Sequence, residues 1–196
     1  MLPELLDTAR KGLEGATAGD EQGAADMVIR KLEQGDEDAT RAFFERIPEA
    51  DQRFFKEDVL EPGTVERWTA DARVRRLIAI ADDGTVRGYA AVVPGVGWSK
   101  HVAELHVIVD PDERRDGLGT QLVWKALELT RELDLGKLVV EVVAEQEGAV
   151  EMFERLGFCR EAVLPGHVRD RDGKEHDLVL LANTGLLAAE FEGAAS

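Results

Sequence analysis

The segment AELHVIVDPDERRDGLGT, from Ala103 to Thr120, decides the fold, because an apolar strand in it leads directly into a glycine-containing loop that opens a helix. Residues 102–109 are almost continuously apolar, which predicts a strand buried on both faces, and Asp110-Pro111 then supplies turn residues. Beyond the loop, leucine and alanine recur at spacings of three and four over 118–133, which predicts a helix with one apolar face.

Gly117 and Gly119 stand where this helix begins, although each costs about 1 kcal/mol of helix propensity relative to alanine. Their presence indicates that a ligand approaches the backbone there, and the unpaired amides and positive dipole of a helix start suit a phosphate group. A dinucleotide-binding fingerprint would need glycine in place of Leu122. A P-loop would need Gly-Lys-Ser/Thr where Gly119-Thr120-Gln121 stands, so the sequence excludes both motifs.

The pattern Arg-x-x-Gly-x-Gly over 114–119, directly after a strand ending Val-x-Pro, resembles motif A of the GNAT acetyltransferase superfamily. The segment 146–158 resembles motif B of the same superfamily, whose usual form is Asn-x-x-Ala-x-x-x-Tyr-x-x-x-Gly-Phe. Gln146 replaces the usual asparagine, and Phe153 replaces a tyrosine that is proposed to protonate the departing thiolate in many members. The general acid is therefore left open.

This resemblance implies an α/β fold of the GNAT type, with a single, mixed and mostly antiparallel central sheet flanked by helices. It also implies acetyl-CoA as the acetyl donor and no metal. Asp116 departs from the basic residue common at its position, and it either weakens coenzyme binding slightly or caps the helix. The coenzyme-binding residues that the resemblance implies are Ile108, Val109, Arg114, Arg115, Asp116, Gly117, Leu118, Gly119, Thr120 and Gln146.

Glu104 is the candidate general base, because it is a carboxylate in an otherwise apolar strand that leads to the phosphate loop. Deprotonating a lysine-type amine at pH 7 costs about 4.6 kcal/mol, so a base or a water relay must assist. A buried carboxylate must be hydrated or paired, which favours a position beside a cleft or an ion pair with an arginine. His106 shares a strand face with Glu104 and is either a proton relay or a structural histidine.

The stretch Ala103-Glu104-Leu105-x-Val107-x-Val109 resembles bacterial protein-lysine acetyltransferases of the Pat type, in which a glutamate at this position is the proposed base. Phe43-Phe44-Glu45-Arg46 is similar to their N-terminal part. This resemblance implies a primary amine, either a protein lysine or a small amine, as the acceptor. A catalytically silent acyl-CoA sensor remains the alternative because of Phe153, and a nucleotide-binding module is the weaker rival.

Further elements follow from periodicity and turn residues. Strands are predicted over 27–32, 77–81, 86–93, 138–143, 158–164 and 175–181. Pro165-Gly166 is predicted to interrupt the strand pair near the C-terminus. The strand-helix-strand unit over 102–143 should bring its two strands parallel. Two helical segments are expected to hold Phe43, Phe44, Phe54 and Phe55, either as core residues or beside the acceptor site.

Composition and charge limit the possible classes of protein. With 196 residues, 44% of them apolar, the chain can bury one core, expected as a domain over 25–183 with an N-terminal helix and linker over 1–24 and a tail over 184–196. The N-terminal helix either frays or docks, in the latter case on the core or on a second subunit as a homodimer. The net charge of −16 argues against nucleic acid as a partner. The single Cys159, expected to be buried, and the lack of an apolar span or signal sequence indicate a cytoplasmic protein without membrane association.

Overall fold

A computed structural model describes residues 27–52 and 55–184. The predicted N-terminal extension, Phe54 and residues 185–196 of the predicted tail lie outside the described residues. No helix in the described ranges is long and apolar enough to cross a membrane.

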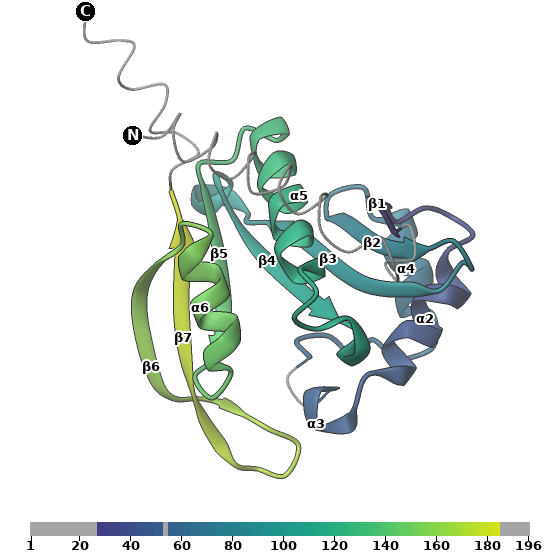
Figure 1. The fold of residues 1–196 in the computed structure, drawn as a ribbon. Helices are drawn as coiled ribbons and strands as arrows, with labels where there is room; N and C mark the ends of the chain where they lie inside the picture. Colours follow the sequence, from purple (N-terminus) through teal and green to yellow (C-terminus); the bar gives the residue numbers. More distant parts are fainter. Residues whose placement is uncertain (1–26, 53–54, 185–196) are drawn as a thin grey trace, which may run out of the picture.

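A seven-stranded sheet forms the centre of the fold, in the order β1-β2-β3-β4-β5-β7-β6 (Figure 1). Neighbouring strands are antiparallel except β4 and β5, which are parallel, so the expected mixed and mostly antiparallel sheet is confirmed. The strands are β1 (Met27–Lys31), β2 (Arg75–Ala81), β3 (Val86–Pro94), β4 (Val102–Val109), β5 (Lys137–Val143), β6 (Cys159–Arg169) and β7 (Glu175–Asn183).

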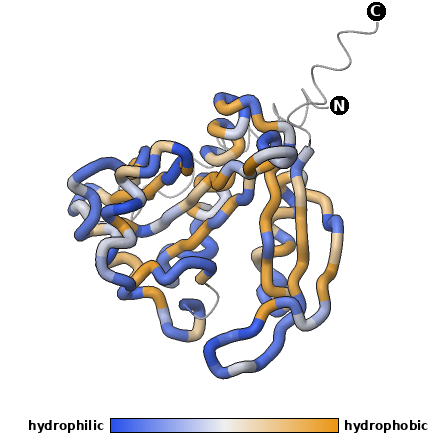
Figure 2. Tube along the Cα trace, turned by 180° about the vertical axis from the view of Figure 1, so that it is seen from behind, coloured by the Kyte–Doolittle hydropathy of each residue, from blue (hydrophilic) through white to orange (hydrophobic). Residues whose placement is uncertain are grey.

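Helices cover both faces of this sheet, and strand alternation divides the core in two. On one face α5 covers Leu77, Ala79 and Ala90, and α6 packs on β7. On the other, α2 and α4 cover Ile78 and Tyr89. Figure 2 shows the apolar residues concentrated along the strands, whereas the tip of the β6–β7 hairpin is hydrophilic. The helices are α2 (Glu37–Arg46), α3 (Glu49–Gln52), α4 (Thr64–Ala70), α5 (Leu118–Glu132) and α6 (Glu147–Arg155), with short 3₁₀ turns η1 (Gly97–Ser99) and η2 (Pro111–Glu113).

Three expectations at the ends of elements were wrong. Strand β6 runs to Arg169, beyond its predicted end at 164, whereas the predicted interruption of the pair at Pro165-Gly166 is confirmed by a register shift between Leu164 and Val168. Cys159, at the start of β6, is exposed and not buried. Both differences have one cause, because β6 is the edge strand, where proline removes no ladder bond and side chains meet solvent. Phe55 lies outside any helix, since α3 ends at Gln52.

Helix α5 approaches the sheet closely at Gly88 of β3. A Cβ atom placed there would lie 2.9 Å from Leu122 Cδ1 and 3.3 Å from Leu118 Cδ2. Both leucines are buried in the core, so neither has free space to move into. The absence of a side chain at position 88 therefore fixes how deeply the N-terminal part of α5 sits on the sheet.

We expect Gly88→Ala to lower the free energy of unfolding by about 1 to 3 kcal/mol through overpacking. The matched control is Gly148→Ala in α6, where an added Cβ atom meets nothing within 4 Å. The control should leave stability unchanged or raise it by about 0.5 kcal/mol. Denaturant titration of the two variants measures the difference, and equal midpoints would contradict the close approach.

Candidate active site

Strands β4 and β5 pair over only three residue pairs and then diverge. Their register is Val102 with Lys137, Ala103 with Leu138, and Glu104 with Val139. Beyond these pairs a cleft of about 840 Å³ opens, lined by residues 105–109 on one side and 140–143 on the other. The backbone edges that face each other across the cleft are thus available to a ligand.

The loop before α5 lies at one end of the cleft and has an unusual backbone. Arg115 and Gly117 both have positive φ angles, 76° and 87°. Such a turn directs successive amides into one concavity, and the first turn of the helix adds amides that have no intrahelical partner. A left-handed arginine is strained, which is typical of functional sites. This loop therefore fits the pyrophosphate of a coenzyme.

Most of the predicted coenzyme residues meet at the cleft. Leu118 does not, because its side chain is 3% exposed and packs in the core under α5, which leaves only its backbone for a ligand. Asp116 is exposed and is not part of the lining. Gly119 packs closely, since a Cβ atom there would lie 3.4 Å from Met152 Sδ. The predicted residues that line the cleft are Ile108, Val109, Arg114, Arg115, Gly117, Gly119, Thr120 and Gln146.

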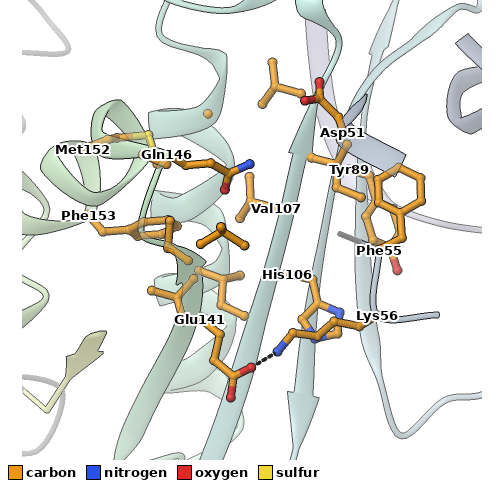
Figure 3. A pocket seen from close by; sticks show the side chains of 18 of the residues that line it. Asp51, Phe55, Lys56, Tyr89, His106, Val107, Glu141, Gln146, Met152 and Phe153 are labelled. Carbon is orange, nitrogen blue, oxygen red and sulfur yellow. Dashed lines mark hydrogen bonds and ion pairs between the residues drawn. The ribbon is translucent and has the colours of Figure 1, made fainter. Parts of the chain in front are cut away.

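Arg114 and Gln146 differ in how they are held. The Arg114 guanidinium donates to Asp51 Oδ2 at 2.6 Å, so it ties the loop to α3 and part of its charge is already compensated. Gln146 precedes α6 at the N-cap position, but its side chain makes no capping hydrogen bond. Figure 3 shows this amide extended into the cleft, where it can meet a ligand.

Glu104 belongs to a charged cluster at the point where β4 and β5 diverge. Its Oε1 atom accepts a hydrogen bond from Lys56 Nζ and lies 3.0 Å from His106 Nε2. Lys56 also donates to Glu141 Oε2 on β5 (Figure 3). The ion pair considered for Glu104 therefore exists, with a lysine in place of the expected arginine, and His106 contacts the carboxylate as the strand alternation predicted.

The partners of Glu104 determine its ionisation. Burial raises the pKa of its carboxyl group, but hydrogen bonds from His106 and Lys56, together with the positive charge of Lys56, outweigh burial and lower the pKa to about 2. Glu104 is not itself part of the cleft lining, whereas Lys56, His106 and Glu141 are. The carboxylate is therefore reached from the cleft through these neighbours.

Glu141 and Lys56 were missed by the sequence analysis. Glu141 carried the same signal as Glu104, a carboxylate within an apolar strand, and the register of β4 and β5 sets both on one sheet face. Lys56 gave no local signal, because it lies 48 positions from Glu104 in a segment without helix or strand periodicity.

Phe153 stands at the position of the usual tyrosine and has no hydroxyl group, and Tyr89, the only tyrosine in the sequence, is buried. Phe153 is 4% exposed and packs edge-on against Phe158 at a centroid distance of 5.2 Å. Tyr89 is 3% exposed and stacks on Trp68. Burial raises the pKa of Tyr89 well above its usual range, so this phenol is a poor proton donor at neutral pH.

A second charged cluster holds the loop that carries Gln146. His176 on β7 places Nε2 3.0 Å from Asp170 Oδ2 and Nδ1 2.8 Å from Glu145 Oε1. The hydrogen bonds that His176 donates to Asp170 and then to Glu145 raise the pKa of His176, and the same bonds lower the pKa of both carboxyl groups. The buried imidazole thus joins the β6–β7 hairpin to the β5–α6 loop.

A sheet with one diverging parallel pair, and a glycine loop that opens a helix beside it, is typical of the acetyltransferase class of α/β fold. Residues 32–158 match the model of the Acetyltransferase (GNAT) family, and the chain belongs to this family of N-acetyltransferases. Among the described residues, no group of three or more histidine, cysteine or acidic side chains is arranged to hold a metal ion.

Individual relatives match this chain either over a short segment or at low sequence identity. An uncharacterized N-acetyltransferase of Methanocaldococcus jannaschii is 42% identical over 73 residues, which are 36% of this chain and 31% of the relative. The putative phosphinothricin acetyltransferase YwnH of Bacillus subtilis is 23% identical over 79% of this chain and 97% of its own length. The chain thus spans less than a third of the first relative and nearly all of the second.

A solved structure supports the fold alone. The GNAT-family acetyltransferase of Streptococcus pneumoniae superposes with a TM-score of 0.67 over 81% of this chain and 99% of its own, at 18% identity.

The His176 cluster predicts a pH-dependent stability. The raised pKa of His176 stabilises the fold at pH values below its ordinary pKa, and this contribution is lost as pH rises through the raised value. Asp170 and Glu145, whose pKa values are lowered, stabilise the fold at pH values above their ordinary pKa. This contribution is lost as pH falls through the lowered values. We therefore expect His176→Gln to lower Tm by several degrees near pH 6 and by less near pH 9.

Thermal unfolding at the two pH values measures this effect. The matched control is His101→Gln, since His101 is exposed and its carbonyl group, not its ring, bonds the backbone. A loss for His176→Gln that stays equal at both pH values would show that the imidazole acts through packing alone.

Proposed function

We propose that this chain is an acetyl-CoA-dependent N-acetyltransferase that acts on a primary amine, either a small amine or a protein lysine. One observation carries the proposal: the same cleft has the left-handed glycine loop at one end and the charged cluster of Glu104, Lys56 and Glu141 where its walls converge. We assign this activity to the domain over 25–183, in a cytoplasmic protein.

The coenzyme fits along the diverging strands. The amides of the loop that contains Gly117 and Gly119 hold the pyrophosphate, and the backbone edges at Ile108 and Val109 offer hydrogen bonds to the amide-bearing pantetheine arm. Gln146 faces the same channel. The thioester then points toward the Glu104 end of the cleft.

The acceptor must lose a proton before its nitrogen can attack the thioester carbonyl carbon. Glu104 takes this proton, and His106, which lines the cleft and touches the carboxylate, relays it. The negative cluster and the net charge of −16 attract a cationic acceptor to this end.

The departing group needs little help from the protein. A thiol has a reference pKa of about 8.5, so a thiolate is a stable leaving group near neutral pH and can take its proton from water. The replacement of the usual tyrosine by Phe153 is therefore compatible with an enzyme, and it does not by itself favour the alternative, a silent acyl-CoA sensor.

Coenzyme binding is tested by calorimetric titration with acetyl-CoA, with ATP as the comparison ligand. We expect micromolar affinity for acetyl-CoA, much weaker binding of ATP, and at least a tenfold loss in Gly117→Val, because a branched side chain disfavours the left-handed backbone of the loop. Gly84→Val is the matched control, since Gly84 has a similar φ of 80° in the β2–β3 turn. If both variants bind equally well, the loop is not the pyrophosphate site.

Glu104→Gln separates the enzyme from the sensor. We expect acetyl transfer to fall by about 10²- to 10⁴-fold while coenzyme affinity stays within about threefold, since the amide cannot accept the proton. Thiol release with a panel of primary amines measures transfer. Glu128→Gln is the control, because Glu128 pairs with Lys125 on the exposed side of α5. A wild-type chain that binds acetyl-CoA but transfers to no amine would favour the sensor.

A further inference from the structure

We propose that Lys56 is an internal acceptor, so that the site acetylates the side chain of its own Lys56 when acetyl-CoA is bound. This inference rests on the proposed transferase function, because it uses the same thioester and the same carboxylate.

The position of the amine carries the proposal. Lys56 Nζ contacts Glu104 Oε1 and Glu141 Oε2, so it lies between β4 and β5 at the convergent end of the cleft. Among the lysines in the described part of the chain, Lys56 alone lines the cleft. In Figure 3 its side chain extends beside His106 toward Glu141. An amine thus already stands where the acceptor nitrogen is needed, in contact with the proposed base.

The ion pairs do not lock this amine in place. The side chains of Lys56, Glu104 and Glu141 are 38%, 34% and 30% exposed, so solvent screens their attraction. Ion pairs of this exposure hold their side chains only weakly. The Lys56 side chain can therefore turn from the carboxylates toward a thioester that enters between the strands.

The transfer balances without any further reactant. The Lys56 ammonium gives one proton to the Glu104 carboxylate, and the free amine forms a C–N bond to the thioester carbonyl carbon. The C–S bond breaks, the nitrogen gives up its second proton, and the departing thiolate takes up this proton. The products are an uncharged Nε-acetyl-lysine at position 56 and free coenzyme A.

Acetylation would change the site for the next acceptor. It removes the cation between Glu104 and Glu141, which leaves two carboxylates on one sheet face for an external ammonium group. Burial raises the pKa of Glu104, and His106 and Lys56 together lower it to about 2. Acetylation removes the charge of Lys56 and so weakens the second effect. The pKa of Glu104 then rises toward its ordinary value, and the carboxylate becomes a stronger base.

The experiment incubates the 196-residue chain with isotope-labelled acetyl-CoA and follows each lysine by peptide mass spectrometry. We expect Lys56 to be labelled at least tenfold faster than Lys125, with a rate constant that does not change over a tenfold range of protein concentration. Lys125 is the matched control, because it pairs with a glutamate at 2.7 Å on α5 but does not line the cleft. Glu104→Gln should abolish the excess label at Lys56 and leave Lys125 unchanged.

Two results would overturn the inference: labelling of Lys56 no faster than Lys125, or a rate constant that rises in proportion to protein concentration, which means transfer between molecules. The amine panel is run in parallel to separate the two proposals. Turnover of an external amine without label at Lys56 refutes the internal acceptor alone. Coenzyme binding with neither turnover nor label refutes the transferase as well.

Discussion

The separation of β4 and β5 after three residue pairs is the constraint on which the rest of the structure depends. Each strand keeps its other edge paired, β4 with β3 and β5 with β7, so the sheet stays whole while the two facing edges part. Backbone groups on such edges need partners, and an amide-bearing ligand supplies them. The cleft is thus a gap that the fold holds open, and in the proposed function a coenzyme arm completes it.

The same separation places the two chemistries of the site at opposite ends. Helix α5 follows β4 and returns the chain to β5, so the loop at its start stands at the open end of the gap. At the closed end, the last paired residue of β4 is Glu104, and Glu141 follows two positions after its partner Val139. The charged side chains therefore lie where the two strands are still paired. The backbone amides of the loop lie where the strands are farthest apart.

Local patterns predicted the parts of the molecule that depend on neighbours in sequence. The apolar strand, the glycine loop and the shared face of Glu104 and His106 follow from periodicity over a few residues, and the structure has all three. The Lys56 contact could not be predicted this way, because it joins segments that only the tertiary fold brings together. The errors at Cys159 and at the end of β6 have a related origin, since strand order, which no local pattern states, makes β6 an edge.

In the proposed mechanism, the surroundings of Glu104 must change before it can act as an effective base. A carboxylate with a pKa of about 2 is held ionised by His106 and Lys56, and the same interactions make it reluctant to accept a proton. An external ammonium group that displaced Lys56 would also keep the pKa of Glu104 low for as long as that group stays charged. Acetylation of Lys56 would remove its positive charge. Glu104 and Glu141 would then both be free to pair with the ammonium group of the acceptor. The lysine that stabilises the resting site is thus also the group that limits its basicity.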